Sequence, residues 1–188
     1  MIKAILEYFN NLWYNLFRIG EVKVMDKEKN NKISILTVAN YVIYYLNQKG
    51  QKITQLKLQK LLYFIEAYNM VCGNPPMFSE KFKAYTYGPL CFEVYNYYKI
   101  FGGKPINVCD EIDEQTKEKL APYKDIIDAV CDTFGDLSAA QLVNLTHEKK
   151  SPWYNVWHRN GGKNSSELGI IEKDLTAKWF RKRFTDEK

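Results

Sequence analysis

The 188-residue chain has few of the residues that bind metals or form disulfides. Its only histidines are His147 and His158, and its four cysteines, Cys72, Cys91, Cys109 and Cys131, are scattered. Zinc sites and disulfide frameworks need such residues at short, regular spacings. His147 opens the string "HEKKS", but Ser151 stands where a zinc metalloprotease has its second histidine. We therefore predict no metal, no cofactor and reduced thiols, which is typical of a cytoplasmic protein.

The short motifs of common enzyme classes are also absent. The chain contains no G-x-S-x-G nucleophile elbow and no G-x-x-x-x-G-K-[ST] phosphate-binding loop. Glu111, Asp113 and Glu114 lie beside Lys117 and Lys119. This pattern is typical of an exposed helix start, and it does not single out a pair of carboxylates for acid–base chemistry. The prediction is a protein that is not an enzyme.

Long apolar runs are missing too. The longest uncharged stretch, residues 33–48, contains asparagines and is shorter than the roughly 20 apolar residues of a membrane helix. The N-terminus shows no signal-peptide pattern. The net charge of +5 is a mild excess, whereas nucleic-acid-binding domains usually concentrate more charge on one face. We expect no membrane span, and nucleic acid is not the favoured partner.

The chain does have a strong helical pattern and many aromatic residues, which make up 15% of the total. Apolar spacing and capping residues predict a mainly α-helical, compact domain over residues 33–188, with one minor β element at residues 81–87. Helix starts are predicted at Ser34, Thr54, Gly88–Pro89, Ser138 and Ser151–Pro152, with a further helix before Gly135 and a last one over residues 172–184.

The first 24 residues predict a separate amphipathic helix, joined to the domain by a polar linker at residues 25–32. Such a helix can dock on its own domain, bind the groove of a partner, or pair with a second copy in a homodimer. Trp13 and Phe17 lie on its apolar side. We treat them as candidate partner contacts, and we expect the extension to contribute to partner choice.

The segment "AYTYGPLCFEVYNYY" (residues 84–98) is the most aromatic part of the chain. Gly88 and Pro89 are predicted to form the joint between a short strand and a helix. The tyrosines on that helix spread over more than one face, so they cannot all point into one core. We expect Tyr87 and Phe92 to be structural. The candidate partner contacts here are Tyr85, Tyr95, Tyr97 and Tyr98.

Three segments together resemble the Panacea domain, also called the SocA-like antitoxin domain, which occurs in many phage-associated proteins. They are "KLQKLLYFIEAYNMVCGNPPMF" (residues 57–78), "FKAYTYGPLCFEVYNYYKIFG" (residues 82–102) and "LSAAQLVNLTHEKKSPWYNVW" (residues 137–157). The residues that match the family pattern are Lys57, Leu58, Gln59, Lys60, Leu61, Leu62, Tyr63, Tyr87, Gly88, Pro89, His147, Pro152 and Trp153. We interpret them as a scaffold signature and not as an active site.

The resemblance implies an antitoxin of a toxin–antitoxin pair. Panacea proteins neutralise unrelated toxins by binding them directly, and a SocA-like member acts instead as an adaptor that delivers its toxin to a Clp protease. We favour direct binding of a cognate protein toxin, with the Clp adaptor as the alternative.

A DNA-binding autoregulator is the alternative from another class. The segment "AKWFRKRF" (residues 177–184) mixes cations and aromatics, and the helices on either side of "EKKS" have helix-turn-helix spacing. Cations in a last helical turn also simply complement the helix macrodipole. Trp153 and Trp157 are typical of packing residues and not of base readers.

Overall fold

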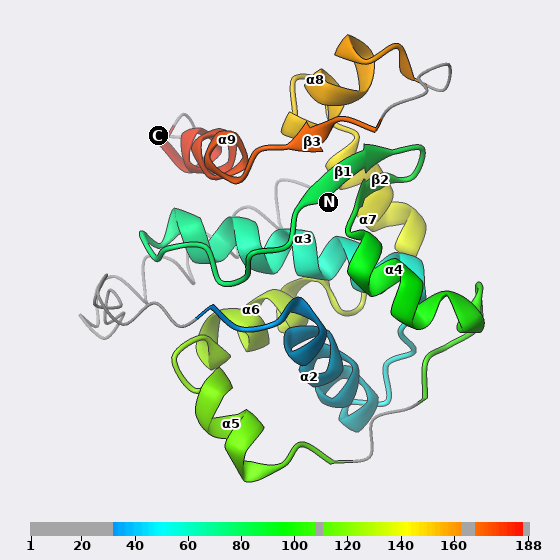
Figure 1. Ribbon diagram of the computed structural model, residues 1–188, viewed down its shortest axis with the longest axis vertical. Helices are drawn as coiled ribbons and strands as arrows, with labels where there is room; N and C mark the ends of the chain where they lie inside the picture. The colour runs from blue at the N-terminus through cyan, green and yellow to red at the C-terminus, as the bar shows by residue number, and fades with distance from the viewer. Residues whose placement is uncertain (1–31, 108–110, 163–167, 186–188) are drawn as a thin grey trace.

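The computed structural model describes residues 32–107, 111–162 and 168–185. In these ranges, helices surround one buried helix and a small three-stranded sheet lies against one side of it (Figure 1). The predicted mainly α fold with a minor β element is therefore confirmed. The predicted N-terminal helix, with Trp13 and Phe17, and all but the last residue of the linker lie outside the described residues.

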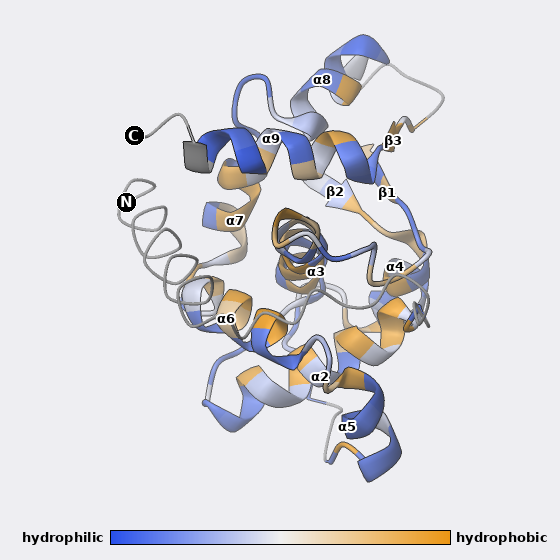
Figure 2. Cartoon of the chain, turned by 90° about the vertical axis from the view of Figure 1, so that its left-hand side faces the viewer, coloured by the Kyte–Doolittle hydropathy of each residue, from blue (hydrophilic) through white to orange (hydrophobic). Residues whose placement is uncertain are grey.

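Helix α3 (Gln55–Val71) is the centre of the fold. Nearly all of its residues are buried, including Lys57, Gln59, Lys60 and Glu66. A helix with no solvated face has to satisfy its polar side chains inside the protein. Figure 2 looks along α3 and shows other helices around it. The helices that contact it are α2 (Ile35–Gln48), α4 (Phe92–Tyr98), α6 (Lys124–Phe134), α7 (Ala139–Thr146) and α9 (Lys173–Thr185).

The helix starts predicted from serine and threonine are confirmed. In each case the side-chain oxygen accepts a hydrogen bond from a backbone N–H of the first turn. These caps are Ser34 for α2, Thr54 for α3, Ser138 for α7 and Ser151 for α8 (Pro152–Arg159). The capping box of Ser138 and Gln141 is complete, and Pro152 occupies the first turn of α8. Pro122 lies between α5 (Glu114–Leu120) and α6.

The sheet has the strand order β2-β1-β3 and is antiparallel throughout. Strands β1 (Phe82–Tyr85) and β2 (Gly88–Leu90) form a hairpin whose turn is residues 86–87, and β3 (Ile170–Ile171) pairs with β1 from far along the chain. Phe82 and Ile171 are paired and buried. The Phe82 ring meets the Tyr63 ring edge-on, with centroids 5.4 Å apart, which fixes the sheet against α3.

The predicted helix start at Gly88 and Pro89 is wrong. These residues begin β2, and α4 starts later, at Phe92. Gly88 has a φ of +95°, which suits a tight hairpin and not a helix. Pro89 lies on an edge strand, where a missing N–H is tolerated. Helix α4 then continues into the 3-10 turn η2 (Lys99–Phe101).

Candidate functional site

The family-pattern residues of α3 and α8 fix the β1–β2 hairpin by its main chain. The Gln59 side-chain amide donates to the Cys91 carbonyl at 3.1 Å and accepts from the Cys91 N–H at 2.8 Å. The Lys60 ammonium donates to the Pro89 carbonyl at 2.7 Å. From the other side, Trp153 Nε1 donates to the Tyr85 carbonyl at 2.9 Å. Side chains that are remote in sequence thus place the hairpin and the start of α4.

Lys60 is the most unusual of these residues because its side chain is almost completely buried, with a relative exposure of 1%. Burial penalises the charged ammonium and lowers the pKa of Lys60 to about 7. Its acceptor at Pro89 is a neutral carbonyl, which compensates only part of the cost of burying a charge. Lys60 therefore holds the hairpin through a group whose protonation changes near neutral pH.

Gly88 allows the hairpin to approach α3 and α7 closely. A Cβ added at this position would lie 2.6 Å from Thr146 Oγ1 and 2.9 Å from Lys60 Cε. Real Cβ atoms essentially never come this close to another atom, so any other residue here would force the Thr146 and Lys60 side chains to shift. The glycine of the family's Gly-Pro pair is thus favoured by close packing beneath the hairpin.

His147 and Trp153, two further family-pattern residues, form a stacked pair next to these contacts. Their ring centroids are 3.6 Å apart with an interplanar angle of 3°, and Trp157 stacks on Trp153 in turn at 5.5 Å. Desolvation, followed by the positive charge of Lys60, lowers the pKa of His147 to about 4. A neutral imidazole stacked on an indole serves as a packing residue. The expectation that Trp153 and Trp157 pack inside the protein agrees with these contacts.

Most of the remaining family-pattern residues pack α3 against the elements around it. Lys57 donates to the Gly135 carbonyl at the end of α6, Leu61 is fully buried, and Tyr63 lies between Phe64, Phe82 and Phe180. Tyr87 differs from the others because its side chain is 61% exposed. The expectation that Tyr87 is structural is wrong, since it lies at the hairpin turn and faces outwards.

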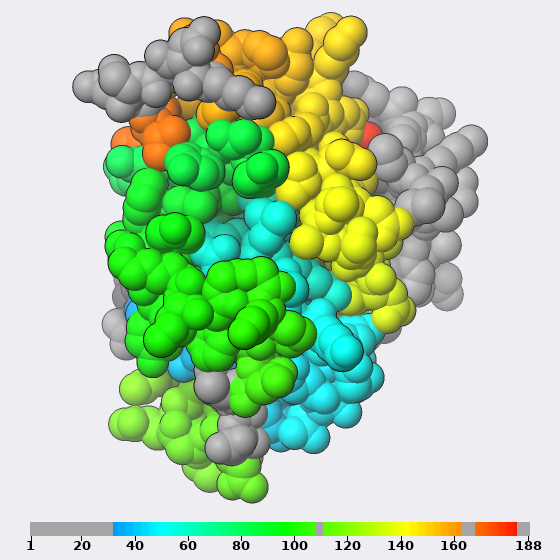
Figure 3. Space-filling model, turned by 90° about the vertical axis from the view of Figure 1, so that its right-hand side faces the viewer, coloured from blue at the N-terminus to red at the C-terminus, as the bar shows by residue number. Residues whose placement is uncertain are grey.

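The exposed large hydrophobic residues are concentrated in one segment of the chain, residues 85–100. The large hydrophobic residues on the hairpin, α4 and η2 that remain exposed are Tyr85, Tyr87, Phe92, Tyr95, Tyr97 and Ile100. We call this set the aromatic surface. In Figure 3 the hairpin and α4 lie on one face of the molecule, beside α7. Several large apolar side chains exposed by one short segment are typical of a protein-binding site.

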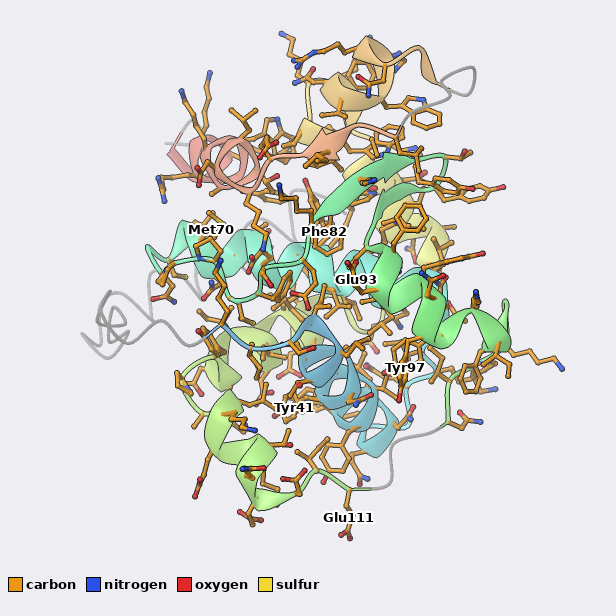
Figure 4. The ribbon with its side chains drawn as sticks, viewed as in Figure 1. Tyr41, Met70, Phe82, Glu93, Tyr97 and Glu111 are labelled. Carbon is orange, nitrogen blue, oxygen red and sulfur yellow. The ribbon has the colours of Figure 1, made fainter. Side chains whose placement is uncertain are left out.

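Two expectations about this segment need correction. Tyr98 is fully buried, and its hydroxyl donates to Asn40 Oδ1 on α2, so it is not available as a partner contact. Its ring packs edge-on against Tyr97, with centroids 4.9 Å apart. Phe92 was expected to be structural, but it is 37% exposed and belongs to the aromatic surface. Figure 4 labels Tyr97 and Glu93, which both come from α4.

Two buried cysteines have thiols that burial keeps protonated. Burial raises the pKa of the Cys91 thiol to about 12 and also raises that of Cys131, so neither is a ready nucleophile at neutral pH. Within the described residues, no three histidine, cysteine, aspartate or glutamate side chains gather as a metal site would require. Cys109 lies outside the described residues.

The basic residues of α9 are largely committed to internal contacts. Lys173 forms an ion pair with the buried Glu66 at 2.5 Å, and Arg181 donates to the Met70 carbonyl at 3.1 Å. Arg183 pairs with Glu148 and lies over the Trp179 ring. These contacts join α9 to α3 and to the α7–α8 connection, which favours a structural role for this segment over binding to nucleic acid.

Over the part of the chain that the structure describes, none of the helices combines the length and apolar character that crossing a bilayer requires.

Comparisons with known proteins agree with the family pattern. The family model described as "Antitoxin SocA-like, Panacea domain" matches residues 58–154, which include most of α3, the hairpin, α4 and the start of α8. The chain is 32% identical to "Antitoxin SocA" of Caulobacter vibrioides (strain NA1000 / CB15N) over 144 residues, or 72% of this chain and 77% of that protein. No solved structure matches the chain.

Proposed function

Since the chain belongs to the SocA-like antitoxin family with a Panacea domain, we propose that it neutralises a cognate protein toxin by binding it directly. The observation that carries the direct-binding part is the aromatic surface. Its members come from one short segment, and two of them, Tyr87 and Tyr97, are about 60% exposed. Tyrosine provides a large contact area and a hydroxyl at little cost in conformational entropy, and it is enriched among the residues that dominate binding energy.

Neutralisation would proceed by occlusion. The rigid hairpin and α4 present the aromatic surface to the toxin, and the complex covers the active site or substrate channel of the toxin. Gln59, Lys60 and Trp153 contribute by fixing the hairpin beforehand, so that little ordering is needed on binding. No chemical step on the toxin is required.

The test is to co-express the full chain with the product of the neighbouring open reading frame and measure growth. The purified chain is then added to the purified neighbour product, and the toxic activity is assayed with no other protein present. We expect growth to be rescued and the activity to be inhibited at a one-to-one ratio. A neighbour product that is harmless, or that the chain does not bind, would contradict the proposal.

The same assay separates the alternatives. Rescue that requires a Clp protease, without inhibition of the purified toxin, would identify a protease adaptor. Retardation of the chain's own promoter fragment, with a steep dependence on salt, would identify a DNA-binding autoregulator.

The N-terminal extension is tested by deleting residues 1–24. We expect the shortened chain to bind the toxin less tightly, or to lose discrimination between toxins. Full rescue with unchanged affinity would show that the extension does not contribute to partner choice.

A further inference from the structure

Two lysines bracket the aromatic row on α4. The Lys83 ammonium, from β1, lies 5.6 Å from the centroid of the Phe92 ring, and the Phe92 and Tyr95 rings meet edge-on with centroids 6.4 Å apart. Lys99 follows Tyr95 by one helical turn and reaches Asn96. A stripe of cation, aromatic, aromatic and cation thus runs from the sheet along α4.

The outer face of the sheet continues this stripe. Side chains alternate along β1, so Phe82 and Ala84 are buried while Lys83 and Tyr85 face outwards. Lys83 stands opposite Leu90 on β2 and Ile170 on β3. Ile170 is 39% exposed and Leu90 is half-buried, so this cross-strand row adds apolar area beside Phe92.

The charge of the segment is one-sided. Residues 81–104, which carry the hairpin, α4 and η2, contain four lysines and one acidic residue, Glu93. Their net charge is therefore +3, whereas the whole chain carries +5. The lysines are Lys81, Lys83, Lys99 and Lys104. The carboxylate of Glu93 accepts a hydrogen bond from Cys91 Sγ at 3.1 Å.

From this arrangement we propose that the aromatic surface binds an acidic segment of the toxin, whose carboxylates pair with Lys83 and Lys99 and whose apolar side chains contact Phe92 and Tyr95. The inference rests on the proposed antitoxin function and deepens it by naming the chemistry of the contacted segment. Complementary charge raises the association rate and selects the partner, while the aromatic rings supply most of the affinity.

Nucleic acid fits this surface less well. Single strands bind by stacking bases on free ring faces. Here the Lys83 ammonium lies over the Phe92 ring, and Phe92 and Tyr95 meet edge-on.

A second copy of the chain also fits poorly. A two-fold contact would bring together two surfaces that each carry an excess of lysine, and like charges facing each other oppose association.

The experiment uses the full-length chain and the product of the neighbouring open reading frame. Overlapping 15-residue peptides that cover the neighbour product are tested for binding, and the affinity of the intact product is measured at low and high salt. We expect the binding peptides to be net negative and to contain apolar residues. The affinity for the intact product should fall as salt rises.

Charge reversal tests the named lysines. Lys83→Glu and Lys99→Glu together should weaken binding roughly tenfold or more, because two attractions become repulsions. The control is Lys178→Glu, an exposed lysine on α9, which lies on the other side of the molecule in Figure 1. It should leave the affinity unchanged. If the Lys83 variant folds poorly, the affinity of Lys99→Glu alone is measured instead. Lys99 is exposed, so this single change should leave the fold intact.

The outcomes separate this inference from the antitoxin function. If the double variant binds and rescues as well as the wild type, or if the binding peptides are neutral or basic, the acidic-segment proposal is overturned while the antitoxin function stands. Loss of a homodimer in the double variant, or binding of a single-stranded oligonucleotide in place of peptides, would also overturn it. A neighbour product that does not bind the wild type contradicts the antitoxin function itself.

Discussion

The ammonium of Lys60, buried on α3, donates a 2.7 Å hydrogen bond to the carbonyl of Pro89 in the hairpin. The acceptor is a main-chain carbonyl and not a carboxylate, so the charged form of Lys60 is only partly compensated. This contact holds β2, the strand between the hairpin turn and α4, and it gives the stability of the fold a definite dependence on pH.

The wild type should gain stability relative to Lys60→Met as pH rises from 7 to 9.5. Burial lowers the pKa of Lys60 to about 7 in the folded chain, from an ordinary value of 10.5. Between these values the unfolded chain binds a proton that the folded chain does not, so stability increases with pH. The relative gain should be on the order of 3 kcal/mol. Urea unfolding of both proteins at several pH values measures it.

Other groups titrate alike in the wild type and in Lys60→Met, so their contribution cancels in the difference between the two unfolding free energies. A free-energy difference that stays constant over this pH range would show that Lys60 keeps its ordinary pKa despite its burial.

Gly88→Ala should destabilise the protein more than Gly73→Ala. Both glycines have positive φ, +95° and +87°, so alanine is strained at either position by about 1–2 kcal/mol. Only at Gly88 would the new Cβ collide with Thr146 and Lys60, because nothing lies within 4 Å of the Cβ position at Gly73. The collision should add roughly 1–3 kcal/mol. Thermal unfolding of the two variants measures the difference, and equal losses would refute the close-packing account of Gly88.

Gln59→Ala should cost about 2–4 kcal/mol of stability. Its side chain satisfies both the N–H and the carbonyl of Cys91, and each group would be left buried without this partner. Gln115→Ala, the same change on an exposed position of α5, should lie within about 0.5 kcal/mol of the wild type. Chemical denaturation of both variants is the measurement. A loss at Gln59 no larger than that at Gln115 would mean that the hairpin does not depend on this side chain.

Tyr97→Ala combined with Tyr87→Ala should weaken toxin binding by about tenfold or more while leaving the stability nearly unchanged. Both side chains are largely exposed, so they contribute little to folding, but exposed tyrosines are frequent binding hot spots. Leu175→Ala on α9 removes another exposed hydrophobic side chain, 57% exposed, and serves as the control. Binding is measured by calorimetry and function by growth rescue. If the tyrosine double variant and Leu175→Ala change the toxin affinity equally, the toxin contact lies elsewhere.

Local sequence signals were sufficient where the structure is decided locally. The caps Ser34, Thr54, Ser138 and Ser151 each act on the turn that follows them, and reading them from the sequence placed four helix starts correctly. The buried lysines of α3 illustrate the opposite case. Nothing in the local pattern around Lys60 shows that its acceptor is the Pro89 carbonyl, which a hairpin brings to it.

The errors at the candidate site also come from tertiary contacts. A proline after glycine predicts a helix start, but here pairing of Ala84 with Pro89 makes it an edge strand. Tyr97 and Tyr98 are adjacent and chemically identical, but Tyr98 lies on the buried face of α4 with Val94, and its hydroxyl donates to Asn40 on α2. Ile170 was missed because its place beside β1 depends on a strand of two residues.

The contacts of Gln59, Lys60 and Trp153 with the hairpin and the start of α4 all end on main-chain atoms, at Cys91, Pro89 and Tyr85. Every residue offers a carbonyl, so these contacts do not depend on which outward-facing side chains the hairpin and α4 carry. Mutations can therefore accumulate on the outside of the segment while the frame beneath it stays intact. Descendants of one ancestral gene could in this way exchange one binding partner for another without evolving a new fold.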